Sequence, residues 1–560
     1  MNTSILAPGA RPSGNTTTAA ARTATEGEAL RGPAPYARRR SSIKVCGPLG
    51  ERFDEILTPA AIRFITALHD RFADRRSTHL QHNAGRQAMI DRGVDPGFLS
   101  ATAAIRDEPT WRVAPPASGL ADRRVELTGP TDRQTAVEAL ESGAQVWLAD
   151  HEDGLSPTWQ NVIGGQVTLF DAIRGRIGNE PERAPTIVFR PRGWHLKEHH
   201  LRYVDSAGEV TPASGTLTDF GLYLFHNARE LIARGTGPYF SLPKLENHLG
   251  ARLWDDVFTF SENALGLDHG TIRATVLIET ITAAFEMEEI LYELRDHCAG
   301  LVAGRWDYLF SAIKAFRKRG RSYLLPDRRQ ITATAPFMHA FTELLVQTAH
   351  KRGAHAIGGM KAFIPDPNEP ALTEAALTRI AAGKRREAEA GYDGTWVAHP
   401  GLIATASAEF DAVLQGRPNQ LEHTRDDVRV TAADLLRFEL DGSSITAEGI
   451  RHNVSVALRY LESWMRGHGS VAIDGLVEDA STAEISRSQL WHWIQQGALT
   501  EDNRPIVRER VEWVIDATLA GIDRRDGDRF DDAAELLREL ALGDEFPAFL
   551  TNPAYRRYLG

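Results

Sequence analysis

The chain has 560 residues, of which 42% are hydrophobic and 25% are charged, and its formal net charge at pH 7 is −11. This composition is ordinary for a globular enzyme, and the length excludes a small scaffold held together by disulfides. The negative net charge argues against a nucleic-acid partner. No run approaches the roughly 18 apolar residues of a membrane-spanning helix. We therefore expect small-molecule partners rather than nucleic acid or a membrane.

The amino-terminal part is expected to contain two segments. Residues 1–43 are rich in Thr, Ala, Ser, Gly, Pro and Arg without an apolar period, which is typical of a disordered tail. A transit peptide is the alternative, because the stretch is rich in Arg and poor in acids. Residues 44–115 are expected to form a helical segment, since Pro59 begins a helical pattern of apolar residues from Ile62 to Phe72.

Eight short apolar runs recur between residues 125 and 400. They are Val125–Thr128, Val146–Asp150, Thr186–Arg190, Tyr239–Lys244, Thr275–Thr280, Gly300–Gly304, Ala354–Gly359 and Thr395–Pro400. Each is too short and too rich in β-branched or aromatic residues for an independent helix. Helix-like stretches lie between them, and this alternation predicts a parallel (β/α)8 TIM barrel over residues 116–405. An open doubly wound sheet is the alternative, but no Gly-x-Gly-x-x-Gly follows the first strand.

Residues 406–560 are expected to form a separate, all-helical carboxyl-terminal domain. Apolar residues recur at helical spacing from Ile450 to Met465. Ser481 and Glu484 have the spacing of a capping box, which predicts the start of another helix. The predicted fold class is therefore α/β, with a TIM barrel between an amino-terminal helical segment and this helical domain.

Charged residues gather at the predicted carboxyl ends of the strands, where the loops of a parallel barrel converge. They are Asp150, Glu152 and Asp153 after the second strand, Arg190 and Arg192 at the third, Glu279 at the fifth, Asp307 after the sixth and His399 at the eighth. Acids and bases at one rim indicate a divalent cation together with an anionic substrate.

Glu279 and Asp307 are the candidate metal ligands. They lie one strand–helix–strand repeat apart, so they should face each other across adjacent loops. Two carboxylates with waters and substrate oxygens are a usual Mg²⁺ site, and zinc is less expected because no close His/Cys cluster accompanies them. The alternative is that each carboxylate caps a helix or pairs with an arginine.

Two further features point to anion binding. The guanidinium of Arg190 presents fixed donors to a carboxylate or an enolate oxygen, although a salt bridge to Glu152 or Asp153 would explain it equally well. The consecutive residues Gly304, Arg305, Trp306 and Asp307 are able to offer backbone N–H groups to a small anion.

Several of these segments together resemble malate synthases. Asp296–Phe310 is similar to the signature of that family, and further similar segments occur in the family's order: Arg190–His195, Leu277–Thr280, Trp396–Gly401 and Glu478–Arg487. The similarity runs from about residue 45 to the end of the chain and is to the shorter, A-type isoform. Two residues depart from the family pattern: Val302 stands where asparagine is usual, and His151 where phenylalanine is usual.

The resemblance implies a Mg²⁺-dependent condensation of glyoxylate with acetyl-CoA, followed by hydrolysis of malyl-CoA to malate and CoA in the glyoxylate cycle. Glu279 and Asp307 would hold the Mg²⁺, and the backbone of residues 304–307 would bind the glyoxylate carboxylate. Asp479, supplied by the helical domain, would remove a methyl proton from acetyl-CoA. Arg190 would stabilise the resulting enolate oxygen, and Pro400 would line the CoA cleft.

Alternatives remain for one residue and for the function. By its position alone, Asp479 could simply favour the positive end of a helix. A malyl-CoA or citramalyl-CoA lyase would use similar barrel chemistry in reverse, and a catalytically inactive barrel would serve as an interaction scaffold.

The chain has only two cysteines, Cys46 and Cys298, which favours a reducing, cytoplasmic location.

Overall fold

The computed structural model describes residues 40–178 and 184–560. The predicted tail therefore lies outside the described residues, except for its last four. Of these, Ser42 and Ile43 belong to strand β1 (Ser42–Val45). Within the described part of the chain, no helix is both long and apolar enough to cross a membrane.

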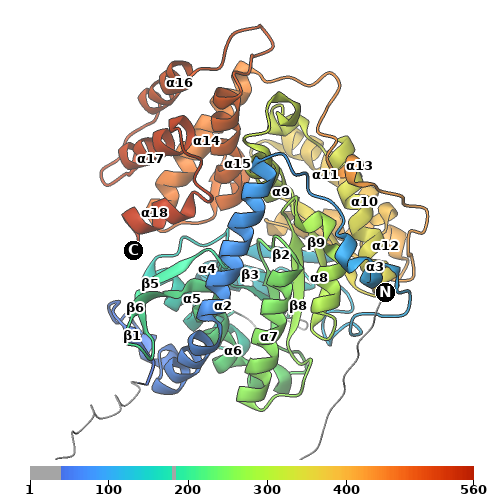
Figure 1. Cartoon of the computed structure of the whole chain (residues 1–560), viewed down its shortest axis with the longest axis vertical. Helices are drawn as coiled ribbons and strands as arrows, with labels where there is room; N and C mark the ends of the chain where they lie inside the picture. Colours follow the sequence, from blue (N-terminus) through green and yellow to red (C-terminus); the bar gives the residue numbers. More distant parts are fainter. Residues whose placement is uncertain (1–39, 179–183) are drawn as a thin grey trace, which may run out of the picture.

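A closed barrel of eight parallel strands lies at the centre of the described chain (Figure 1). In pairing order the strands are β10 (His355–Lys361), β11 (Gly394–Val397), β2 (Val125–Gly129), β3 (Val146–Asp150), β4 (Thr186–Arg190), β7 (Tyr239–Leu242), β8 (Arg273–Ile278) and β9 (Cys298–Ala303). Each overlaps one of the eight predicted apolar runs, and the predicted barrel is confirmed. The strands pair in chain order, as expected when each connects to the next through a crossover helix.

The barrel strands are buried on both faces, which is why they form continuous apolar runs. In β3, Val146 and Leu148 belong to a cluster inside the barrel, whereas Trp147 and Ala149 belong to the cluster shared with the surrounding helices. These helices are α4 (Arg133–Glu141), α5 (Trp159–Ile173), α6 (Gly215–Ala233), α7 (His248–Leu265), α8 (Met287–Glu293), α9 (Trp306–Phe316), α10 (Pro336–Lys351), α11 (Pro370–Ala390) and α12 (Ile403–Leu414). The alternation of side chains along each strand thus separates two cores.

We expected the amino-terminal part to be helical, but it also contains a strand. It has the helices α1 (Phe53–Ile56), α2 (Pro59–Asp91) and α3 (Ala103–Asp107), and α2 runs along the outside of the barrel (Figure 1). Strand β1, however, pairs with β5 (Lys197–Val204), which pairs in turn with β6 (Val210–Ser214) in an antiparallel sheet. The prediction missed β1 because its partner lies far along the chain, and four residues alone carry no pairing signal.

The carboxyl-terminal domain packs helices around a core of its own. They are α14 (Ala447–Met465), α15 (Ala480–Gln495), α16 (Arg508–Ala520), α17 (Phe530–Leu542) and α18 (Thr551–Tyr558), preceded by the short α13 (Ala432–Leu435). The prediction of an all-helical domain is wrong in one respect, because β12 (Val471–Ile473) and β13 (Leu476–Glu478) form a hairpin between α14 and α15. In Figure 1 helices α14 to α18, orange to red, stack beside one end of the barrel, whereas α13 lies next to α10.

The predicted capping box at Ser481 and Glu484 is also wrong. Helix α15 begins one residue before Ser481, and Asp479 is its N-cap, with its carboxylate accepting a hydrogen bond from the backbone N–H of Ser481 at 3.0 Å. Glu484 instead pairs with Arg487 at 2.7 Å inside the helix. An aspartate with extended backbone directly before the helix is the stronger cap, so it sets the start.

A buried ion pair inside the barrel offers a test of how the barrel core is stabilised. Arg123 Nε donates to Glu126 Oε1 at 2.6 Å, both side chains are buried, and Glu126 also accepts from the indole of Trp396. Arg123→Met leaves a buried carboxylate without its cation, which costs about 3–5 kcal/mol. We expect a lower midpoint of thermal unfolding, measured by circular dichroism. Adding Glu126→Gln removes the charge and keeps an acceptor for Trp396, so it should recover most of the loss. An unchanged midpoint in the single variant would contradict this.

Candidate active site

The carboxyl ends of the barrel strands bring most of the predicted site residues together. Asp150 and Arg190 are the last residues of β3 and β4, and they are opposite each other in the register of the two strands. Glu279 directly follows β8, and Asp307 lies in the first turn of α9, just after β9. These four side chains are buried, so their charges interact through protein rather than through water.

Arg190 is held by two carboxylates. Its guanidinium forms a two-pronged ion pair with Asp150, with Nε at 2.6 Å from Oδ1, and its Nη1 lies 3.2 Å from Asp153 Oδ2. The salt bridge to Asp153 that we considered from the sequence is therefore present, and Asp150 contributes the stronger pairing. Both bonds fix the plane of the guanidinium at the mouth of the barrel.

Asp153, Glu279 and Asp307 form a compact carboxylate cluster. One oxygen from each lies within 4.8 Å of the others. Burial and the neighbouring carboxylates raise the pKa of Glu279 well above its usual range and that of Asp307 to about 6, against the opposing effect of nearby cations. Nearby positive charge would stabilise the ionised form of these carboxyl groups.

Lys244, two residues after β7, supplies part of that charge. Its Nζ lies 3.0 Å from Asp153 Oδ1 and 2.9 Å from Asp307 Oδ2, and its backbone N–H donates to Glu279 Oε1 at 2.7 Å. Its φ of 54° is in the left-handed region, a strained conformation for a lysine. We did not single out this residue from the sequence, where the one available signal was a lysine that ends an apolar run at the rim.

The cluster fits a divalent cation. Asp307 Oδ1 is buried and has no hydrogen-bond partner among the described residues, so it retains a free lone pair. The donors are all carboxylate oxygens, which Mg²⁺ prefers. Asp153 joins the two predicted ligands as a third carboxylate; we had placed it at the rim but not in the metal set.

The segment from Gly304 to Asp307 leads into helix α9. Arg305 occupies the N-cap position and gives no side-chain cap, so the first backbone N–H groups of α9 are not satisfied by a capping side chain. The guanidinium of Arg305 lies over the ring of Trp306, at 4.3 Å from its centroid. An uncapped helix start beside a positive side chain favours a small anion.

Asp479 reaches the same place from the carboxyl-terminal domain. The β12–β13 hairpin bonds to the loop after β10, where Ile364 N donates to Gly475 O at 2.9 Å and Val477 N to Ala362 O at 2.7 Å. At the start of α15, Ala480 N donates to the carbonyl oxygen of Asp153 at 3.2 Å. These backbone contacts fix the position of Asp479 relative to the rim.

The side chains of both domains line one cavity of about 450 Å³. Its lining includes Asp153, Arg190, Glu279, Gly304, Arg305, Trp306, Asp307 and Asp479. Burial and, to a smaller extent, the charge of Asp153 together raise the pKa of Asp479 to about 7. At neutral pH this carboxyl group is therefore able both to accept and to release a proton.

Pro400 lies apart from that cavity. It lines a second cavity of about 860 Å³ together with His399, Thr135 and the segment 466–472. The β12–β13 hairpin separates the two, since Val477 faces the larger cavity while Leu476 and Glu478 line the smaller one. Successive residues of a strand point to opposite sides.

The two residues that depart from the family pattern are both buried. Val302 belongs to the apolar cluster inside the barrel. His151 Nε2 lies 2.8 Å from Thr131 Oγ1, and its Nδ1 lies 3.6 Å from Asp219, which is paired with Arg192 at 2.8 Å. Neither side chain lines the cavity that contains Asp479.

Three family profiles match successive parts of the chain. They are "Malate synthase, N-terminal domain" over residues 42–104, "Malate synthase, TIM barrel domain" over 186–438 and "Malate synthase, C-terminal" over 444–558. The barrel match begins at β4, and the structure adds β2 and β3 to the barrel.

Individual relatives agree with these matches. The chain is 52% identical to "Malate synthase" of Streptomyces clavuligerus over 92% of this chain and 98% of the relative, and 42% identical to "Malate synthase, glyoxysomal" of Candida tropicalis over 92% and 95%. A solved structure of Haloferax volcanii malate synthase, a ternary complex with pyruvate and acetyl-CoA, covers 72% of this chain and 99% of its own at 18% identity and a TM-score of 0.45. On its matches along nearly the whole described length, the chain belongs to the malate synthase family.

Proposed function

We propose that this malate synthase condenses acetyl-CoA with glyoxylate and hydrolyses the malyl-CoA product to malate and CoA. The observation that carries the proposal is the 450 Å³ cavity. A carboxyl group with a pKa of about 7, an arginine and a carboxylate cluster surround this one small volume. The names of the relatives support the same reaction.

Glu279 and Asp307 would hold Mg²⁺ in this cavity, with Asp153 beside them. The free lone pair on Asp307 Oδ1 supports this assignment. Bound Mg²⁺ would polarise the aldehyde of glyoxylate and favour the charged form of the carboxylates. The backbone N–H groups of residues 305–307 would orient the carboxylate of the substrate, whereas that of Gly304 already donates to the carbonyl oxygen of Ile278 at 3.1 Å.

Asp479 would be the base. A thioester methyl group is a very weak acid, so a carboxylate removes its proton only where the developing oxyanion meets preorganised positive charge. Arg190 would supply that charge, since Asp150 and Asp153 already hold its guanidinium in place. The enolate carbon would then attack the aldehyde carbon, the aldehyde oxygen would take up a proton to become the hydroxyl group, and water would cleave the thioester to release malate and CoA.

The larger cavity, lined by Pro400, would take the CoA portion. It is next to the smaller one, on the other face of the hairpin that ends at Asp479. The hairpin would therefore direct the acetyl group toward the base while the rest of CoA stays outside the reacting volume. Exclusion of water around the enolate strengthens its electrostatic stabilisation.

Two further proposals come from the sequence. The amino-terminal segment, barrel and carboxyl-terminal domain would cover residues 44–115, 116–405 and 406–560. A cytoplasmic location is favoured because the sequence has only two cysteines in 560 residues. The lyase and the inactive scaffold are disfavoured by the cavity, where a carboxyl-terminal domain contributes a carboxyl group beside an intact set of barrel residues.

Arg190→Ala tests the oxyanion role. Loss of one preorganised donor costs about a hundredfold to a thousandfold in turnover, and we expect a loss of that size in a continuous assay of CoA release. Arg252→Ala is the matched control, because Arg252 forms an exposed ion pair with Glu293. Turnover of Arg190→Ala within about threefold of the parent would refute the role, being far below the effect of a lost donor.

Asp479→Asn separates the base from the helix cap. Asparagine caps a helix about as well as aspartate, so α15 should keep its start and the unfolding midpoint should stay unchanged. The amide cannot accept the proton, and exchange of the acetyl methyl protons with deuterated solvent, followed by NMR, should be lost. Exchange at the parental rate would show that another residue is the base.

Magnesium should affect both stability and products. Because Mg²⁺ offsets repulsion among Asp153, Glu279 and Asp307, it should raise the unfolding midpoint of the parent and have little effect on Glu279→Gln. The parent should release CoA from acetyl-CoA only when glyoxylate and Mg²⁺ are both present, and malate should accumulate. Formation of acetyl-CoA and glyoxylate from malyl-CoA as the main reaction would identify a lyase instead.

A further inference from the structure

A second group of possible metal ligands lies at the opposite end of the barrel. Glu262 is near the end of α7, His269 lies in the loop between α7 and β8, and His297 directly precedes β9. These residues come before β8 and β9, whereas Glu279 and Asp307 come after them. The group is therefore separated from the candidate active site by the length of the strands.

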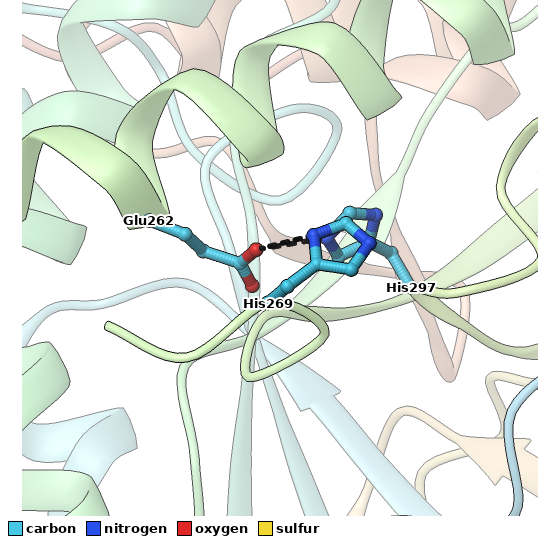
Figure 2. A group of neighbouring side chains, drawn as sticks. All are labelled: Glu262, His269 and His297. Carbon is cyan, nitrogen blue, oxygen red and sulfur yellow. Dashed lines mark hydrogen bonds and ion pairs between the residues drawn. The ribbon is translucent and has the colours of Figure 1, made fainter. Parts of the chain in front are cut away.

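The three side chains converge on one point. Figure 2 shows the carboxylate of Glu262 directed at the rings of His269 and His297. Glu262 Oε2 lies 3.2 Å from His269 Nδ1 and 3.2 Å from His297 Nε2, and the three ligand atoms are within 4.8 Å of one another. Tetrahedral zinc, with bonds of about 2.0–2.1 Å, places its ligands about 3.3 Å apart. Two of the three separations already match.

Neighbouring groups orient Glu262 and His297, and a further carboxylate lies near His269. Asp255 Oδ1 lies 2.8 Å from His297 Nδ1, which leaves Nε2 facing Glu262, and Asp296 Oδ2 lies 3.5 Å from His269 Nε2. Backbone N–H groups of the α7–β8 loop, at Gly270 and Ile272, donate to Glu262 at 3.1 and 2.9 Å. A carboxylate on the far nitrogen of a histidine is the usual outer partner in metal sites.

Burial and charge also suit a cation. Glu262 and His297 are buried, while the side chain of His269 is 56% exposed, so an ion has a path from solvent and a position for water. Three acidic side chains surround the two histidines and give the group negative charge: those of Asp255, Glu262 and Asp296.

We propose that Glu262, His269 and His297 bind a divalent transition-metal ion of the zinc class, which ties the α7–β8 loop to the start of β9. Two imidazole nitrogens and one carboxylate favour Zn²⁺ over Mg²⁺, which prefers oxygen ligands. The site is structural, because it lies away from the residues proposed for the reaction. Its chemistry is therefore independent of the carboxylate cluster at the other end of the barrel.

The test uses the full chain, stripped of metal by a chelator and then saturated with Mg²⁺ in mildly alkaline buffer. After addition of Zn²⁺ and gel filtration, metal analysis should find one equivalent of retained zinc in the parent and in Glu279→Gln. The zinc should raise the unfolding midpoint. In a parallel titration, Co²⁺ should give the visible absorption of a site with nitrogen ligands.

His269→Ala should lose the retained zinc and the shift of the midpoint, while its malate formation stays at the parental level. Asp255→Asn should weaken zinc binding by about 10- to 100-fold, as expected for an outer partner. His82→Ala and Cys46→Ser, which change exposed potential ligands elsewhere, are matched controls and should retain zinc. Absence of retained zinc in the parent, or retention unchanged in His269→Ala, would overturn the proposal.

Discussion

The carboxyl ends of the barrel strands bury more negative than positive charge, and the organisation of the site follows from this imbalance. Six carboxyl groups lie there: those of Asp150, Glu152, Asp153, Glu279, Asp307 and Asp479. In the described part of the chain, the cations paired with them are Arg190 and Lys244. Burial raises the pKa of Glu152 to about 8, and it also raises the pKa values of Glu279, Asp307 and Asp479. The surplus makes a divalent ion favourable and keeps a carboxyl group ready to exchange a proton.

The same charges depend on how the two domains dock. Asp479 lies at the end of a short hairpin, and backbone hydrogen bonds attach that hairpin to the loop after β10 and the start of α15 to Asp153. These bonds involve no side chain of the hairpin, so many sequences could preserve them. The position of the candidate base is thus determined by an interface between main chains, and its pKa is raised by burial and by the charge of Asp153 across that interface.

The two residues that depart from the family pattern, Val302 and His151, lie outside the cavity in which we propose the reaction. Val302 replaces a polar residue with an apolar one inside the barrel, where its neighbours are apolar as well. His151 connects Thr131 to Asp219, whose pKa is lowered by the adjacent Arg192 against the effect of burial. Neither residue lines the 450 Å³ cavity, so neither contributes a side chain to the proposed site.

The sequence by itself determined the eight barrel strands, because parallel strands buried on both faces form continuous apolar runs separated by amphipathic helices. It also selected Glu279, Asp307, Arg190 and Asp479 as candidates, since strand ends and family motifs are local, and the structure places all four on one cavity. Only the tertiary structure decided that Lys244 enters the carboxylate cluster, that β1 pairs with β5, and that Pro400 lies in a separate cavity. These features depend on contacts between residues far apart in the chain, and no local pattern of residues specifies which distant groups will meet.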